Sequence, residues 1–200
     1  MDRLRALWDF DDLDASRCRF QEQLEREPDD AGRAEVLTQL ARIEGLRGDF
    51  DACARLLDRA AAAPVRERLE RGRMLRSSGD PAAALPLFEE AYALARETRQ
   101  WYLAGDAAHM AALAGDMHAW TQRGLELAEQ EPDASYWRGP LLNNLGWHLI
   151  EAGRHAEAVT AFERALRARE DDPANERALA AAREALAAAR DAAGRAAPGR

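Results

Sequence analysis

The hydrophobic positions of the chain repeat in four segments of the same design. Each segment has a glycine followed by an alanine-rich stretch, in which a bulky apolar residue comes one helical turn after a small one. The glycines are Gly48, Gly79, Gly115 and Gly153, which lie 31, 36 and 38 residues apart. A period in the mid-thirties with two helical stretches per period predicts an array of helix pairs joined by tight turns. We expect about eleven helices and no strand.

The residues at the glycines have the chemistry of a turn between two helices. Glycine adopts the left-handed conformation that commonly ends a helix. Asp49, Asp80 and Asp116 each follow one of these glycines directly. An aspartate at this position caps the next helix, because its carboxylate accepts hydrogen bonds from the free amides of the first turn. Pro81 suits the same first turn, where its missing N–H costs nothing.

Three bulky residues are expected to be buried at equivalent places. Leu57, Phe88 and Phe162 each lie four residues after a small residue, on the same helical face. The small residues, which allow two helices to approach closely, are Cys53, Ala84 and Ala158. In the third segment Trp120 stands where a small residue is expected, so its second helix should pack differently.

The two ends of the chain predict helices that complete the array. Residues 10–20 look like the second helix of a half-repeat at the amino end. From Pro173 to about Asp191 the sequence predicts one long helix. Its apolar stripe, at a spacing of three and four, suits a helix that covers the last apolar face of the array. The stripe consists of Leu179, Ala182, Leu186 and Ala189.

Composition favours a folded helical protein and disfavours several classes of function. Hydrophobic residues make up 47% and charged residues 32% of the 200 residues, and the formal net charge is -8. An acidic total makes a nucleic-acid partner unexpected. No apolar stretch approaches the roughly 20 residues that a membrane span needs, and the amino end is too charged for a signal peptide. The two cysteines, Cys18 and Cys53, could form one bridge but no disulfide framework, so we expect a cytoplasmic protein.

The fourth segment carries the residues of a known repeat. The run Leu142-Asn143-Asn144-Leu145-Gly146 is followed by Leu149, Gly153, Ala158, Phe162 and Ala165. This pattern resembles the tetratricopeptide repeat family, and the segment around Gly48 is similar to it. The resemblance implies an all-α fold, a right-handed α-solenoid of antiparallel helix pairs. It divides the chain into a half-repeat at 1–31, repeats at 34–64, 65–98, 101–134 and 139–172, a capping helix at 173–191 and a flexible tail at 192–200.

The resemblance also implies where a ligand would bind, since the first helix of each pair lines a concave groove in this family. In the second repeat this face carries Arg66, Arg73 and Arg76, which suit an acidic peptide or a terminal carboxylate because arginine pairs with carboxylates bidentately. The alternative is that these arginines belong to a solvated helix face, paired with nearby glutamates.

Five further candidates lie on the first helices of the third and fourth repeats. Asn144 is expected to hold a ligand backbone through its amide, or else to bond a neighbouring helix. Trp147 and Tyr102 are expected to face the groove, with His109 beside Trp147. An aromatic floor next to arginines is typical of a binding hot spot, although ordinary packing between helices is the alternative. The expected peptide-binding residues of these two repeats are Tyr102, His109, Asn143, Asn144 and Trp147.

The sequence therefore predicts a scaffold that binds a peptide or partner protein in the groove, the ligand being acidic or ending in a carboxylate. The alternative is a module that self-associates through the ends of the solenoid into a homo-oligomer. No nucleotide-binding or nucleophile motif is present, so we expect neither catalysis nor a cofactor. The four histidines are not spaced as metal ligands, and we expect no metal site.

Overall fold

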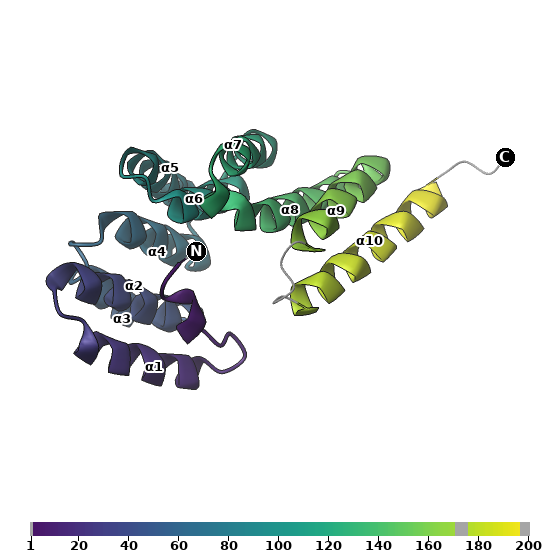
Figure 1. Ribbon diagram of the computed structural model, residues 1–200. Helices are drawn as coiled ribbons and strands as arrows, with labels where there is room; N and C mark the ends of the chain where they lie inside the picture. Colours follow the sequence, from purple (N-terminus) through teal and green to yellow (C-terminus); the bar gives the residue numbers. More distant parts are fainter. Residues whose placement is uncertain (1, 171–175, 197–200) are drawn as a thin grey trace.

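The computed structural model describes residues 2–170 and 176–196, and over these ranges it has ten α-helices, two short 3-10 helices and no strand (Figure 1). The all-α fold is thus confirmed, and two of the helical segments are 3-10 turns. In chain order the elements are η1 (Arg5–Leu7), α1 (Leu13–Arg26), α2 (Asp30–Leu46), α3 (Phe50–Leu57), α4 (Pro64–Ser77), α5 (Pro81–Glu97), α6 (Trp101–Ala114), α7 (Met117–Gln130), η2 (Pro132–Trp137), α8 (Arg138–Glu151), α9 (His155–Glu170) and α10 (Glu176–Ala196).

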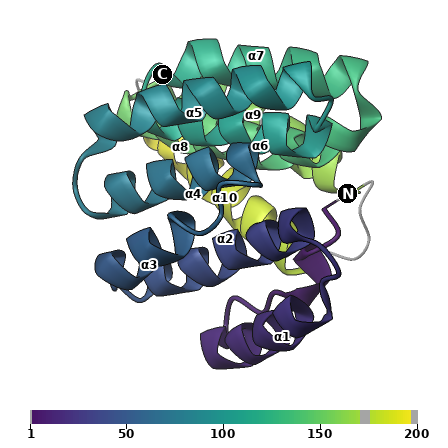
Figure 2. The same cartoon turned by 90° about the vertical axis from the view of Figure 1, so that its left-hand side faces the viewer.

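Successive helices pack in pairs, α2 with α3, α4 with α5, α6 with α7 and α8 with α9. Figure 2 shows the pairs stacked one above another from α1 to α7. Helix α1 packs on α2 at one end, and α10 packs on α9 at the other. None of the helices in the described part of the chain is long and apolar enough to cross a lipid bilayer.

The turns within the pairs follow the expected chemistry in three of four cases. Gly48, Gly79 and Gly153 have φ values of 80°, 101° and 72°, in the left-handed region. Gly115 differs, because its φ is -138°, so α6 ends without a residue in the left-handed region. A Cβ atom at this position would lie 2.9 Å from Cδ2 of Leu85, so glycine allows α6 to end close to this side chain of α5.

The aspartate caps form as expected. The carboxylates of Asp49, Asp80 and Asp116 accept hydrogen bonds of 2.9, 3.0 and 2.9 Å from the backbone N–H three residues later. Asp12 caps α1 in the same way. Each cap satisfies an amide that the helix itself cannot, which fixes where α3, α5 and α7 begin.

The bulky residues of the repeat are buried. Leu57, Phe88 and Phe162 are each 0% exposed, which confirms their expected role between helices. The third pair reverses the pattern, because Trp120 takes the small position and Gly124 the large one. A Cβ atom on Gly124 would lie 2.5 Å from Cδ1 of Leu141, so this leucine of α8 fills the space instead. The different packing expected from Trp120 is therefore local: the large and the small side chain exchange places within α7.

Both ends of the chain depart from their expected bounds. Helix α1 begins at Leu13 and ends at Arg26, whereas residues 10–20 were expected to be helical. The expected start of the last helix at Pro173 lies outside the described residues. Helix α10 extends to Ala196, beyond the expected end at Asp191, because Ala192 and Ala193 are strong helix formers. The rest of the expected tail, residues 197–200, lies outside the described part.

Candidate partner-binding groove

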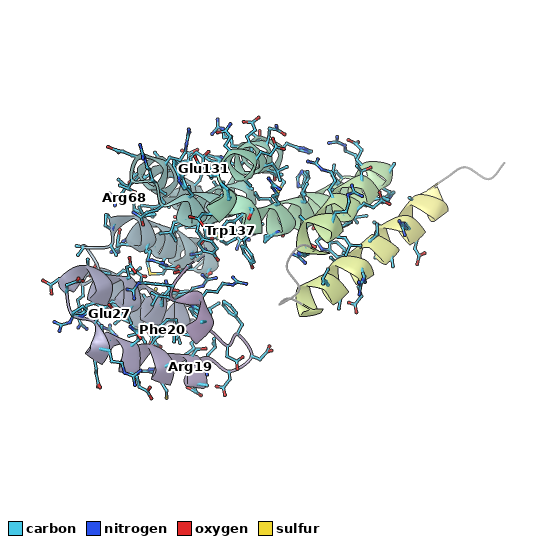
Figure 3. The ribbon with its side chains drawn as sticks, in the orientation of Figure 1. Arg19, Phe20, Glu27, Arg68, Glu131 and Trp137 are labelled. Atoms are coloured by element: carbon cyan, nitrogen blue, oxygen red, sulfur yellow. The ribbon has the colours of Figure 1, made fainter. Side chains whose placement is uncertain are left out.

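A cavity of about 530 Å³ lies on the face that the first helices α2, α4, α6 and α8 share. The segment Asp2–Phe10 forms one wall of it, and Arg169 of α9 and Ala181 of α10 close the other side. Trp137, labelled near the centre of Figure 3, belongs to its aromatic lining. The first helices therefore face a common hollow that the chain's own amino-terminal segment partly fills.

Arg66 holds a carboxylate of the same chain within this cavity. Its Nη2 donates to Oδ1 of Asp2 at 2.6 Å, and its Nη1 donates to Oδ2 at 3.2 Å. The two side chains are 10% and 11% exposed, so the pair is largely removed from water. The third nitrogen, Nε, is buried with no hydrogen-bond partner among the described residues. Two of the three donor positions of this guanidinium are thus used by Asp2.

Arg73 is the centre of a buried ionic network between α4 and α6. It donates to Glu70 through Nη1 at 2.5 Å and to Asp106 of α6 through Nη2. Burial by itself lowers the pKa of Arg73, but the charges of Asp106 and Glu70 outweigh it and raise that pKa. Asp106 is buried too, yet Arg73 and Arg42 hold the pKa of its carboxyl below the usual value. Arg73 and Asp106 therefore stay ionised, and their ion pair fixes α4 and α6 relative to each other.

Arg42 of α2 is the cation of this network with the weakest pairing. Its Nη1 lies 3.8 Å from Oε1 of Glu70, the same oxygen that Arg73 binds at 2.5 Å. Its guanidinium carbon lies 5.4 Å from the ring centre of Trp8. Burial and the nearby charge of Arg73 lower the pKa of Arg42. Arg42 thus brings positive charge to the cavity that the protein only partly compensates.

A further part of the cavity lining is aromatic and consists of Tyr102, Tyr136 and Trp137. Arg5 donates to the hydroxyl groups of Tyr102 at 3.3 Å and Tyr136 at 3.0 Å, and lies 4.2 Å over the Tyr136 ring. Burial, together with the charge of Asp106, raises the pKa of Tyr102 to about 12. Trp137 lies beside both tyrosines, with ring centres 5.3 Å and 5.1 Å away. This lining combines a large apolar area with hydroxyl groups.

His109 packs against Trp137 of this aromatic lining, whereas it was expected beside Trp147. Its ring centre lies 5.2 Å from that of Trp137, and its Nε2 accepts a hydrogen bond of 2.8 Å from Nδ2 of Asn144. Burial lowers the pKa of His109 to about 4; the charge of Asp106 acts in the opposite direction, and the charges of Arg73 and Arg42 lower the pKa further. The imidazole is therefore neutral at neutral pH. Asn144 of α8 thus bonds to the neighbouring helix α6, which is the alternative that the sequence left open for it.

The cavity brings together five of the eight candidate residues, namely Arg66, Arg73, Tyr102, His109 and Asn143. The other three do not line it. Arg76 is exposed and lines a second hollow of about 210 Å³. Trp147 is 43% exposed and meets Phe162 of its own pair edge-on, with 5.3 Å between ring centres. Of the aromatic floor expected next to the arginines, Tyr102 therefore lines the cavity and Trp147 does not.

Sequence reasoning missed the acidic side of the cavity and its amino-terminal wall. Asp106 is the only acidic or arginine residue in the helix Trp101–Ala114, among alanines. A lone carboxylate in an alanine-rich helix is a signal that could have been used, because a buried charge needs a partner. Nothing in the pattern indicated that Asp2 and Arg5 lie against α4 and η2.

The charge of the cavity is opposite to that of the protein. Its lining holds five arginines against three carboxylates, a net charge of +2 in a chain of net charge -8. No group of three histidine, cysteine or acidic side chains suited to a metal ion occurs among the residues that the structure describes. The arrangement is suited to binding an anionic group beside aromatic rings.

Two segments of the chain match models of one protein family. Residues 70–99 and residues 139–172 each match a tetratricopeptide repeat. The first match lies over α4 and α5, and the second over α8 and α9. No curated protein matches the chain. Repeats of this family generally mediate protein–protein interaction and typically form scaffolds without catalytic activity. The chain is thus a helical-repeat protein, and two of its helix pairs, α4 with α5 and α8 with α9, match the tetratricopeptide repeat.

Proposed function

We propose that the cavity on the first helices is where this scaffold binds a partner protein, and that it recognises an acidic side chain or a terminal carboxylate. The observation that carries the proposal is the Arg66–Asp2 pair. A carboxylate from a non-helical segment already lies in the groove, held by both Nη atoms of an arginine. A partner's carboxylate would meet the same donors and a net charge of +2.

The size of the cavity limits what part of the partner enters it. A volume of about 530 Å³ lies in the range of pockets that enclose a compact ligand. The segment Asp2–Phe10 occupies the groove beside α2 and α4, so a long peptide cannot lie along the bare helices there. A chain end or one or two side chains therefore fit better than an extended peptide.

Within the ionic network of α2, α4 and α6, Arg42 has more to gain from an entering carboxylate than Arg73. Its ion pair with Glu70 is long, and its side chain is 28% exposed. A charge-assisted hydrogen bond typically contributes about 1.5–3 kcal/mol. The loss of one such bond should therefore weaken binding roughly ten- to a hundredfold. Arg73 is a poorer contact, because Glu70 and Asp106 already use its donors.

Site-specific photocrosslinking in the native host tests the proposal. A photoreactive amino acid replaces Asn143, which lines the cavity, or Glu89, which is exposed on α5 away from it. We expect an adduct with another protein from position 143 and none from position 89, and Arg42→Gln should reduce the adduct at position 143. Adducts from position 89 alone, or equal adducts from both positions, would place the interface elsewhere.

Two other results would also count against the groove. An adduct between two copies of the chain supports self-association, the alternative function. If neither position gives an adduct while the variants remain folded by circular dichroism, the groove does not bind a protein in the host. Mass measurement of each adduct distinguishes these outcomes.

A further inference from the structure

The segment that carries Asp2 is anchored in the protein independently of its ion pair. Leu4 is 1% exposed and belongs to the core cluster that contains Phe20. Nε1 of Trp8 donates to Oε1 of Gln39 at 2.9 Å. These contacts hold the segment against α1 and α2, so the position of its backbone does not depend on Arg66.

The side chain of Asp2 reaches from this anchored segment across to α4. Besides accepting from Arg66, its Oδ1 accepts a hydrogen bond of 3.1 Å from the backbone N–H of Leu4. Arg66 itself is 8% exposed and makes no other ion pair among the described residues. An arginine so deeply buried needs an anion. The anion that Arg66 has is the side chain of Asp2, which lies in a non-helical segment and not in one of the packed helices.

We propose that the Arg66 guanidinium is a carboxylate-binding subsite of the groove, that Asp2 fills it in the free protein, and that a ligand carboxylate exchanges with Asp2. This inference rests on the proposed function, because it specifies how a carboxylate is received in the same groove. Arg66 thus has two alternative partners, one tethered and one external.

The exchange is chemically balanced. One carboxylate replaces another on the same two Nη donors, and the released Asp2 side chain becomes hydrated. Leu4 and Trp8 keep the segment in place, so no helix has to move. Because a tethered group has a high effective concentration, Asp2 lowers the apparent affinity of the subsite for every external carboxylate. Removal of the Asp2 charge should therefore increase affinity, while a structural ion pair would give no such gain.

The test compares Asp2→Asn with a matched control, Glu35→Gln. Glu35 pairs with Arg3 of the same segment at 2.8 Å, outside the lining of the cavity. Both variants remove one paired carboxylate, but only Asp2→Asn changes the charge of the cavity. The asparagine side chain can still accept a hydrogen bond from the N–H of Leu4.

The probes are N-acetyl-phenylalanine, which resembles a chain end, N-acetyl-glutamic acid α-amide, which offers a side-chain carboxylate, and the uncharged N-acetyl-phenylalaninamide. Calorimetric titration should show that at least one acid binds Asp2→Asn about tenfold more tightly than it binds the parent protein. Glu35→Gln should bind like the parent, and the amide should not bind. The acid whose affinity increases more in Asp2→Asn shows whether the subsite prefers a chain end or a side-chain carboxylate.

The inference is wrong if an acid binds the parent protein and Asp2→Asn gives no gain, or if Glu35→Gln gives the same gain. If no acid binds the parent or Asp2→Asn better than the amide does, carboxylate recognition by the groove fails as well. A second readout needs no variant: the Nε–H signal of Arg66 in nuclear magnetic resonance spectra of the parent should shift when the acid is added and not with the amide. An unchanged signal at saturating acid would contradict the exchange.

Discussion

Gly72 of α4 lies against the ring of Phe88 of α5 so closely that a Cβ atom on this glycine would be 2.5 Å from Cε1 of the ring. The same relationship recurs in the last repeat, where a Cβ atom on Gly146 would be 2.6 Å from Cε1 of Phe162. In each pair the first helix presents bare backbone to the phenylalanine of the second helix. The two segments that match the family share this contact.

Substitution of either glycine by alanine should therefore destabilise the protein. Alanine favours a helix over glycine by up to about 1 kcal/mol, but an extra methyl group in a packed core typically costs about 1–3 kcal/mol. We expect Gly72→Ala and Gly146→Ala to lower the free energy of unfolding by about 1–2 kcal/mol in denaturant titrations. Gly45→Ala is the control, because its Cβ would lie 3.6 Å from Sγ of Cys53, an ordinary contact. A loss of stability in Gly45→Ala equal to that in Gly72→Ala would refute the explanation.

The ionic network predicts strong coupling between Arg73 and Asp106. Their side chains are 13% and 7% exposed, so Arg73→Met leaves a buried carboxylate without its main partner. Such a change typically costs about 3–5 kcal/mol. The double variant Arg73→Met with Asp106→Leu should recover part of that loss, since both charges are removed together. Additive losses in the double-mutant cycle would show that the pair is not coupled.

His109 predicts a loss of stability in mild acid. Its pKa is about 4 in the folded protein and about 6.5 in an unfolded chain, so the unfolded state takes up the proton first as the pH falls. The contribution of the neutral imidazole is fully present above pH 6.5 and is lost progressively toward pH 4. Between pH 7.5 and 5 the parent should lose about 2 kcal/mol more than His109→Gln, which cannot gain the charge. Equal losses in chemical denaturation at the two pH values would contradict this assignment.

The two cysteines should react at very different rates. Both are free thiols, Cys18 exposed and Cys53 buried. Burial, with a smaller effect of Glu70, raises the pKa of the Cys53 thiol to about 11, so little reactive thiolate forms at pH 8. A disulfide reagent should modify one thiol rapidly in the native protein and both in guanidinium chloride. Cys18→Ser should abolish the rapid phase; a rapid phase that persists would mean that Cys53 is accessible.

The sequence by itself determined the features that depend on residues near one another in the chain. The glycine turns, the aspartate caps and the burial of Leu57, Phe88 and Phe162 follow from spacings of a few residues, because capping and helical periodicity are local. The repeat at 139–172 could be identified for the same reason. Arg66, Arg73, Tyr102, His109 and Asn143 could be assigned to one face because they lie on first helices.

Only the tertiary structure decided which of these side chains meet. Arg66 and Asp2 are 64 residues apart, and Arg73 and Asp106 are 33 apart. A repeating pattern assigns each residue a position in its own helix pair, but contacts between pairs depend on how far one pair is shifted and rotated relative to the next. Trp147, which was expected in the groove, instead meets Phe162 of its own pair, because the periodicity of one helix does not fix which way a side chain at its edge turns. The amino-terminal wall belongs to no repeat, so its contact with Arg66 could come only from the folded chain.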